Sequence, residues 1–388
     1  MTVSPLWIAP SYPCEADGYG GIWLRTQAHA LSAIGIRPRI VAPVPWVPPG
    51  LGAIAPQWAR YTDVPSSYDD DGTEVLRPRY FSHPRENKLG APHLMQLLGL
   101  RLAGLAKPSL VHAHFALPYG WVAMRLARHW DVPLVVSLLG DDVNVYPHFS
   151  AGHLRRFREV IEAADVVLSQ GSALDDATEA LTGRRPRTLP LGVNLDMFTK
   201  TRTRAEARAH LNLPTDRPIA FFVGSLFESK GVAELLRALA RLSDHNVLGV
   251  FAGDGPLRHM VDGAPNAMAI GSLSQKGVRD YMEAADMVVL PSHREGLPLC
   301  LVEAGAMECP VVASDVGSVR DLIGRNGDER GRLITAKDED ALTAAMAAVL
   351  GDSDEAARRA ARLLGHVCEH FSDTANARAL ADIYQSLL

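Results

Sequence analysis

The chain has 388 residues, a formal net charge of −5 and 47% hydrophobic residues. This length exceeds a single ordinary core and predicts two domains of about 190 residues each. The acidic balance argues against general nucleic-acid binding, which requires a basic face, and no apolar run approaches the roughly 20 residues that span a bilayer.

The N-terminal segment and the cysteines indicate the compartment. The first residues lack a charged leader followed by an apolar stretch, so they do not resemble a signal peptide. The four cysteines show no metal-ligand spacing: they are Cys14, Cys300, Cys309 and Cys368. We therefore expect reduced, structural thiols in a cytoplasmic protein.

Short apolar segments alternate with helical segments along the chain, which predicts an α/β fold with parallel sheets. In the first half, strands are expected at 6–9, 38–43, 110–113, 133–138 and 166–169, and helices at 21–34, 93–106, 120–128 and 153–163. In the second half, strands are expected at 219–224, 247–252, 267–270, 287–290 and 311–313, and helices at 232–241, 276–284, 298–307 and 318–322. The polar stretch 199–218 is the predicted junction. Two nucleotide-binding-type domains would then face each other across a cleft, with ligands at the carboxyl ends of the strands.

Glycines and histidines mark two candidate ligand loops in the first half. Gly20 and Gly21 precede an amphipathic helix, where glycine lets backbone amides approach a ligand closely; a plain flexible loop is the alternative.

His112 and His114 end a strand and share one of its faces. A metal pair there lacks a third ligand with suitable spacing, so we expect one histidine in the core and one at the cleft. The acidic run at 69–71 is interpreted as a solvated turn rather than a metal site.

Lys230 is the first candidate ligand residue of the second half. It is expected at the start of a helix and at the carboxyl edge of the sheet, a position suited to neutralising a diphosphate. The segment is not a Walker A loop, because the lysine precedes its glycine and no Ser or Thr follows. A solvated surface lysine is the alternative. Tight loops at 253–256 and 271–273 follow the next two strands, and ordinary turns are the alternative for both.

Glu295 and Glu303, spaced E-x7-E, mark the passage from a buried strand into a helix. Gly296 allows a tight turn, and Pro298 suits the first turn of a helix. Free N–H groups and the positive end of the helix dipole would suit a phosphate there. We expect Glu295 on the loop and Glu303 on the helix, both turned toward one ligand.

Together these segments resemble the retaining glycosyltransferases of family 4 (glycosyl transferases group 1), which have the GT-B fold. The resemblance covers nearly the whole chain and is strongest over 219–322. The motifs in the order and spacing of the family are Gly224-x5-Lys230-Gly231, Gly253-Asp-Gly-Pro256, Gly271-x-Leu273, E-x7-E and Pro310-Val-Val-Ala-Ser-Asp-Val-Gly317. Looser agreement in the first half comes from Gly20-Gly21, His114, Gly140-x-Asp142 and the segment 190–198.

The resemblance implies a division into three parts. Residues 1–198 would form a Rossmann-like acceptor-binding domain, and residues 199–370 a Rossmann-like domain that binds the nucleotide sugar. Residues 371–388 would form a C-terminal helix that crosses back onto the N-terminal domain.

The resemblance also implies roles for single residues. Glu303 would accept hydrogen bonds from the ribose, and Glu295 would face the transferred sugar. Lys230 and the amides around 297–299 would hold the diphosphate, while the loop at 271–273 would contact the base. The implied donor-binding residues are Gly20, Gly21, Ser225, Lys230, Gly255, Leu273, Glu295, Gly296, Leu297, Pro298, Leu299 and Glu303; the implied catalytic residues are Glu295, Lys230 and His114.

Two positions depart from the family pattern. Ser225 stands where an arginine is frequent, which removes one positive charge from the diphosphate site. Leu139 stands where a histidine that contacts the transferred sugar is frequent. These departures motivate one alternative hypothesis, a sugar-nucleotide-binding protein with little catalytic activity.

The leading hypothesis is a retaining, metal-independent glycosyltransferase of the hexosyltransferase class. It would transfer a sugar from a nucleotide sugar, such as a UDP-sugar or GDP-sugar, to a saccharide or lipid-linked acceptor in polysaccharide or glycoconjugate synthesis. No cofactor is expected, because lysine and the helix dipole supply positive charge. A transferase acting on a small natural product, such as an aminocyclitol, is the other alternative.

The sequence gives fewer indications of the acceptor than of the donor. An apolar segment at 94–102 and the arginines Arg155, Arg156 and Arg158 could meet the inner face of a membrane. A core helix and a solvated helix face are the preferred interpretation of these two features.

Overall fold

A computed structural model describes residues 3–14, 16, 20–48, 56–59, 61–81, 97, 100, 104–324 and 329–388. The chain divides into two compact units, one formed by Met1–Gly192 with Asp373–Leu388 and the other by Val193–Ser372. Each unit contains a largely parallel sheet with helices between its strands. The predicted class of two Rossmann-like α/β domains is confirmed.

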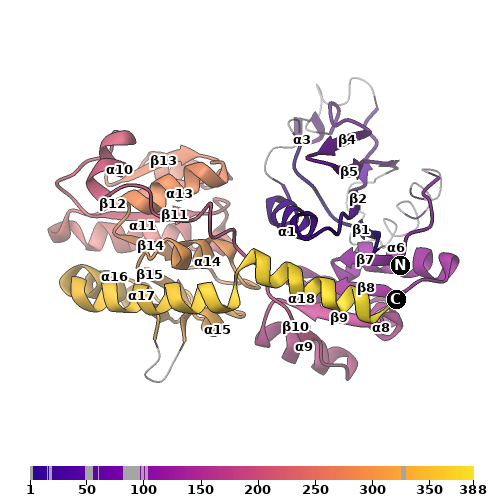
Figure 1. Ribbon diagram of the computed structural model, residues 1–388. Coiled ribbons are helices and arrows are strands. Elements are labelled where there is room, and N and C mark those ends of the chain that lie inside the picture. Colours follow the sequence, from indigo (N-terminus) through magenta and orange to yellow (C-terminus); the bar gives the residue numbers. More distant parts are fainter. Residues whose placement is uncertain are drawn as a thin grey trace. The chain divides into compact units, whose positions relative to one another are not determined.

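In the described part of the first unit, eight strands form one sheet in the order β10-β9-β8-β7-β1-β2-β5-β4 (Figure 1). Its strands are β1 (Pro5–Ile8), β2 (Arg39–Val41), β4 (Ser67–Asp70), β5 (Thr73–Leu76), β7 (Leu110–His114), β8 (Leu134–Ser137), β9 (Val166–Ser169) and β10 (Arg187–Thr188). A separate short pair joins β3 (Val44–Pro45) to β6 (Arg79–Tyr80). The inner strands β1, β7 and β8 are buried at every residue, as expected when both faces of a parallel sheet are covered.

Helices follow the strands of this unit. They are α1 (Ile22–Ala33), α3 (Pro56–Ala59), η1 (Ala116–Gly120), α6 (Trp121–Trp130), α7 (Asp141–Asn144), η2 (Tyr146–Phe149), α8 (Ala151–Ala163), α9 (Ser172–Thr182) and α18 (Asp373–Ser386). The helix predicted at 93–106 lies largely outside the described residues. Of its apolar side chains, Leu100 is buried in the core and Leu97 packs against it, which supports the interpretation of this segment as core.

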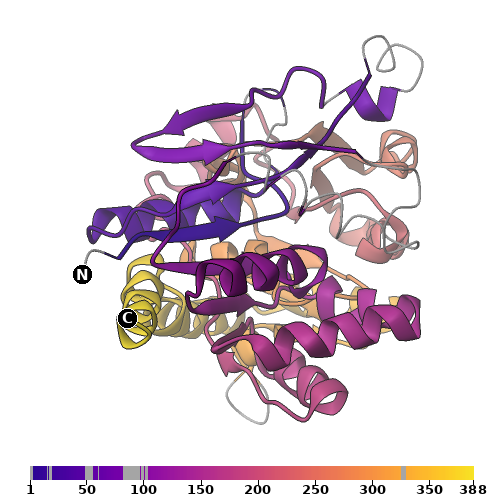
Figure 2. The same ribbon diagram turned by 90° about the vertical axis from the view of Figure 1, so that its right-hand side faces the viewer.

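The hairpin of β4 and β5 forms one edge of the first sheet, and its two strands pair with each other in antiparallel orientation (Figure 2, purple arrows). Its turn contains Asp71 and Gly72, and the Gly72 N–H donates to Asp69 Oδ1 at 2.8 Å. Of the acidic run, only Asp71 lies in the turn, because Asp69 and Asp70 belong to strand β4 and the Asp70 side chain is only 12% exposed. The expectation of a solvated turn over all three residues is therefore wrong.

The C-terminal helix α18 belongs to the first unit (Figure 1, yellow). It packs beside α1, where Gln27 Nε2 donates to Asn376 Oδ1 at 3.0 Å. Tyr384 is fully buried and accepts a hydrogen bond from Trp7 Nε1 at 2.9 Å. The predicted return of the last helix to the N-terminal domain is confirmed.

The second unit has six parallel strands in the order β13-β12-β11-β14-β15-β16. They are β11 (Ile219–Val223), β12 (Leu248–Ala252), β13 (Ala267–Gly271), β14 (Met287–Leu290), β15 (Val311–Ser314) and β16 (Arg332–Ile334). Counted within the unit, this is the order 3-2-1-4-5-6 of dinucleotide-binding Rossmann sheets. The order reverses between β11 and β14, and ligands bind at such switch points, outside the carboxyl ends of the strands.

The helices of the second unit lie before, between and after these strands. They are α10 (Arg204–His210), η3 (Glu228–Lys230), α11 (Val232–Arg241), η4 (Ser243–His245), α12 (Arg258–Asp262), α13 (Gln275–Ala284), α14 (Leu299–Ala306), α15 (Val319–Ile323), α16 (Glu339–Gly351) and α17 (Ser353–His370).

The polar stretch at 199–218, predicted as a junction, contains a helix of the second unit. Helix α10 starts with a reciprocal capping box between Thr203 and Glu206. Arg208 is buried, and its guanidinium lies 2.5 Å from Asp286. The polar side chains of this segment form a helix cap and ion pairs within the unit. The segment is therefore not a free linker.

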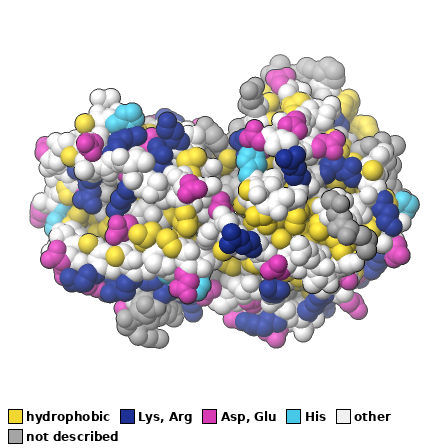
Figure 3. Space-filling model, in the orientation of Figure 1, with side chains coloured by type: hydrophobic (Ala, Val, Ile, Leu, Met, Phe, Trp, Pro, Cys, Tyr) yellow, Lys and Arg dark blue, Asp and Glu magenta, His cyan; other side chains and the backbone are white. Residues whose placement is uncertain are grey.

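On the face in Figure 3, acidic and basic side chains are interspersed. Among the described residues, every helix is too short or too polar to cross a bilayer.

Candidate functional site

The candidate donor site of the second unit lies at its switch point, where β11 and β14 pair. The short helix η3 follows β11 and ends at Lys230, and residues 291–298 connect β14 to α14. Lys230 Nζ and Glu295 Oε1 form an ion pair at 2.6 Å. The Lys230 side chain is 28% exposed and that of Glu295 is 10% exposed. Lys230 is therefore engaged and partly covered, unlike a freely solvated surface lysine.

Two glycines allow the loops of this site to interlock. Gly231 has φ +70°, and a Cβ built on it would lie 2.1 Å from the Pro291 carbonyl oxygen. Gly317 has φ +55°, and its Cβ would lie 2.2 Å from the Glu295 carbonyl oxygen. Only glycine fits a left-handed backbone at such close approach. The loop with Glu295 is consequently held from both the β11 side and the β15 side.

Replacing Gly231 with alanine should destabilise the second unit, because the methyl group adds backbone strain to a clash with a carbonyl oxygen. We expect the unfolding temperature to fall by roughly 5–10 °C. The control is Gly365→Ala in α17, where the added methyl meets nothing within 4 Å and the helix propensity improves. Calorimetry that finds the two variants equally stable would contradict this account of the loop.

Glu303 lies on α14, while Glu295 lies on the preceding loop, as the sequence predicts. Burial raises the pKa of Glu303 to about 7. Helix α14 starts after Pro298, and no side chain of the described residues caps it. The Leu301 N–H donates to the Pro298 carbonyl at 3.1 Å, so the N–H groups before it and the positive dipole end are those that could bind an anion. Gly296 and Leu297 lead into this helix start, and Leu299 is its first residue.

Three further predicted donor residues lie in the loops after β11, β12 and β13. Ser225 follows β11 and is exposed. Gly255 lies against Leu226, whose N–H donates to the Asp254 carbonyl at 2.9 Å. Leu273 is partly buried against the core of the unit. All three lie at the sheet edge that carries Lys230, because the carboxyl ends of parallel strands share one edge.

The remaining predicted residues lie at the corresponding switch point of the first unit, between β1 and β7. Gly20 and Gly21 directly precede α1. His114 is the last residue of β7 and is fully buried. Neither ring nitrogen of His114 has a hydrogen-bond partner in the described part of the chain. Burial lowers its pKa well below the usual value, so the imidazole is neutral.

Both histidines are fully buried, so the expectation that one of them lies at the cleft is wrong. His112 is the one that is held by hydrogen bonds. Its Nδ1 lies 2.5 Å from Tyr384 Oη and its Nε2 lies 2.8 Å from Ser137 Oγ. Burial lowers its pKa to about 3. Because both nitrogens are engaged, His112 does not form a metal pair with its neighbour.

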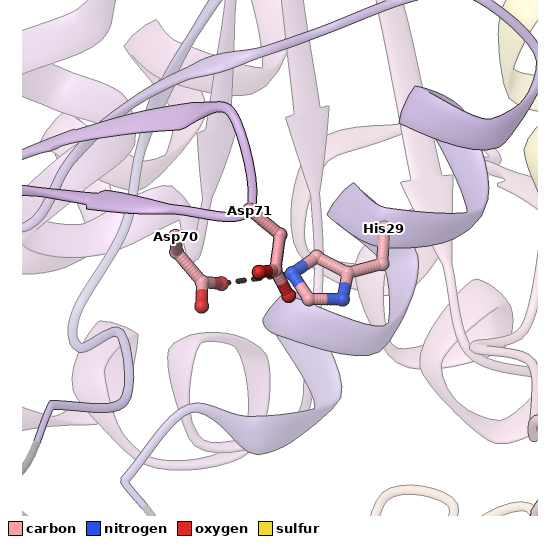
Figure 4. Close-up of side chains that lie close together, drawn as sticks. All are labelled: His29, Asp70 and Asp71. Carbon is pink, nitrogen blue, oxygen red and sulfur yellow. Dashed lines mark hydrogen bonds and ion pairs between the residues drawn. The ribbon is translucent and has the colours of Figure 1, made fainter.

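One group of described side chains has the spacing of metal ligands: His29, Asp70 and Asp71, in the first unit (Figure 4). The Asp70 carboxylate lies 2.7 Å from Arg25 and 2.8 Å from His29, and accepts a hydrogen bond from Tyr12 at 2.8 Å. Burial alone would raise the pKa of Asp70, but the bonds from Tyr12 and His29 keep it below its usual range. A cation would have to displace Arg25, so this group is an ion-pair network.

Asp142 has a structural role that the sequence analysis did not assign. Its buried carboxylate accepts backbone N–H bonds from Ala116 at 2.8 Å, Leu139 at 3.0 Å and Gly140 at 2.9 Å. Burial raises the pKa of Asp142 to about 6. The residue joins the loops after β7 and β8, and the Gly140-x-Asp142 motif was the signal for it.

Two Rossmann-type units, a last helix that returns to the first unit and a lysine–glutamate pair at the switch point of the second define a GT-B architecture. Residues 20–193 match the family "Glycosyl transferase 4-like domain", and residues 203–362 match "Glycosyl transferases group 1". A Bacillus subtilis protein, TuaC, whose name assigns it to teichuronic acid biosynthesis as a glycosyltransferase, is 33% identical over 98% of both chains. This chain belongs to the group 1 family of glycosyl transferases, as its motifs indicate.

Solved structures agree with this fold. A sucrose-phosphate synthase from Thermosynechococcus elongatus superposes with a TM-score of 0.81 at 22% identity, over 99% of each chain. Anabaena HepE, solved in complex with UDP-glucose, gives a TM-score of 0.75 at 18% identity, over 99% of this chain and 100% of HepE.

Proposed function

We propose that this glycosyltransferase is a retaining enzyme that transfers a hexose-type sugar from a nucleotide sugar to a saccharide or lipid-linked acceptor in polysaccharide synthesis. The observation that carries the proposal is the Lys230–Glu295 ion pair beside the uncapped start of α14. The 33% identity to TuaC over nearly the whole chain supports polysaccharide synthesis, because the name of that relative places it in teichuronic acid biosynthesis.

In the proposed reaction, the bond between the anomeric carbon and the donor phosphate oxygen breaks. The acceptor hydroxyl oxygen bonds to the same face of that carbon, and its proton passes to the departing phosphate oxygen. The diphosphate gains negative charge as it leaves. Lys230 and the amides of 297–299 would stabilise this charge, because donors that are fixed in advance need no reorganisation.

The ion pair suggests how the site prepares for the donor. Glu295 neutralises Lys230 at 2.6 Å. A diphosphate would compete with this carboxylate for Lys230, which releases Glu295 to accept hydrogen bonds from the sugar hydroxyls. Ser225 adds no charge here, so Lys230 would be the main cation that faces the diphosphate.

The other roles follow the same proposal. Ionised Glu303 would accept hydrogen bonds from the ribose hydroxyls, and the loop with Leu273 would border the base. Gly20, Gly21 and His114 would approach the phosphates or the acceptor from the first unit. A neutral His114 can supply a hydrogen bond but no positive charge. Lysine and the dipole of α14 would replace a metal ion.

The proposed location is the cytoplasm, with peripheral association to the inner face of the membrane where a lipid-linked acceptor requires it. The helix α8 that carries the arginines gives this association little support. Arg158 donates to the Leu181 carbonyl at 2.8 Å, and Arg155 lies 3.7 Å from Glu159. Arg155 and Arg158 therefore interact with groups of their own unit.

A panel of nucleotide sugars tests the proposed donor class, and UDP-glucose is the first to try. The correct donor at about 100 times its dissociation constant should stabilise the protein by about 2.7 kcal/mol, which thermal unfolding detects. The Glu303→Ala variant should lose this stabilisation. If no nucleotide sugar changes the unfolding temperature, the proposal is wrong.

A further inference from the structure

The hydroxyl group of Tyr384, on the C-terminal helix α18, forms hydrogen bonds with two of the aromatic side chains around His114. Tyr384 Oη accepts the indole N–H of Trp7 at 2.9 Å and lies 2.5 Å from His112 Nδ1. The Trp7 ring centroid is 4.7 Å from that of His114, and the His112 ring is stacked on His114 at 4.3 Å. All four side chains are fully buried within the first unit.

The direction of these hydrogen bonds follows from the donors. An indole N–H can only donate, so Tyr384 Oη accepts from Trp7. The phenol proton then points to His112 Nδ1, because any other arrangement would leave a buried O–H without a partner. His112 therefore carries its proton on Nε2 and donates to Ser137 Oγ at 2.8 Å. Both nitrogens of His112 are used, which fixes the plane of its ring.

His114 differs from His112 in how it is held. Within the described part of the chain, no hydrogen bond reaches either of its nitrogens. Its orientation is therefore set by the packing of Trp7, His112 and the more distant Trp23 ring at 5.8 Å. Trp7 and His112, its two nearest rings, are both tied to Tyr384.

We propose that Tyr384 is a positioning residue, which holds the buried His114 ring in one orientation through Trp7 and His112. The inference rests on the proposed role of His114 in the transferase reaction. It gives the returning C-terminal helix a part in catalysis beyond closing the fold, because the helix supplies the atom that fixes both neighbours of His114.

A double-mutant cycle separates this role from simple stabilisation. Tyr384→Phe should lower kcat about ten-fold with KM for the donor changed less than about two-fold, because a small misplacement of a reacting group is costly. Tyr384→Phe combined with His114→Ala should be no slower than His114→Ala alone. An equal ten-fold loss in both backgrounds, or no loss in either, would overturn the proposal.

A matched control and a second measurement make the test independent of turnover. Gln27→Ala removes a different hydrogen bond between α1 and α18 and should leave kcat unchanged. In protein with isotope-labelled histidine, the ring resonances of His114 should shift in Tyr384→Phe and stay in place in Gln27→Ala. Unchanged His114 resonances in Tyr384→Phe would overturn the positioning role, whatever the activity. A wild-type protein without transferase activity would instead count against the proposed function.

Discussion

Lys230→Ala is expected to lower kcat/KM for the donor by about 10²- to 10³-fold, the usual effect of losing one fixed group that stabilises a developing anion. The departing diphosphate would lose its main facing cation, since Ser225 supplies none. The matched control is Lys200→Ala, because Lys200 is also paired with a glutamate, Glu308, at 3.1 Å in the same unit. This variant should retain wild-type kinetics. A Lys230→Ala enzyme within three-fold of wild type would contradict the phosphate role.

Glu295→Gln should separate binding from turnover. The substitution removes the carboxylate that holds Lys230 at 2.6 Å and that repels a phosphate. We expect the affinity for the free nucleoside diphosphate to rise by roughly two- to five-fold, the scale of a partly exposed ion pair, while sugar transfer falls. Calorimetry measures the first effect and steady-state kinetics the second. Weaker binding of the nucleoside diphosphate would show that Glu295 does not compete for Lys230.

Nucleotide binding should strengthen as the pH rises through 7, because the pKa of Glu303 is raised to about 7. Below this pKa the group is a neutral acid and loses acceptor capacity; above it, the carboxylate can accept bonds from both ribose hydroxyls. The ionised fraction rises about ten-fold between pH 6 and pH 8. We therefore expect the association constant to rise by about the same factor, as measured by calorimetry at each pH.

Glu303→Gln is the control for this pH dependence. Its amide does not titrate, so the part of the rise that comes from Glu303 should disappear, and any remaining slope belongs to the nucleotide phosphates. The variant should also bind roughly 10- to 150-fold more weakly than wild type at pH 8, since one hydrogen bond to a charged group contributes about 1.5–3 kcal/mol. Parallel pH profiles for the two proteins would refute the ribose assignment.

Strands buried on both faces were the most predictable elements of the fold. The segments Met287–Leu290 and Val166–Ser169 have the same bounds in the sequence prediction and in the structure, because an inner parallel strand is a continuous apolar run. The hairpin strand β4 was missed. It lies at the sheet edge with alternating exposed residues, Ser67–Asp70, and its polar sequence has no strand signal.

Residues of the candidate site could be predicted singly, but their pairing could not. Lys230 and Glu295 are 65 positions apart in the sequence, and only the pairing of β11 with β14 brings their loops together. The bond between Trp7 and Tyr384 spans 377 positions, and no local pattern near Tyr384 indicates it. Asp142 was part of a recognised motif, yet its three backbone donors depend on the packing of two loops.

The most direct test of the central claim follows the released nucleotide and the new glycosidic bond in one reaction. With the donor found by thermal stabilisation and a saccharide acceptor, we predict one nucleoside diphosphate released for each product formed. NMR should show that the anomeric configuration of the donor is retained in the product. Donor binding without release, as expected for a sugar-nucleotide-binding protein, or a product of inverted configuration would contradict the account.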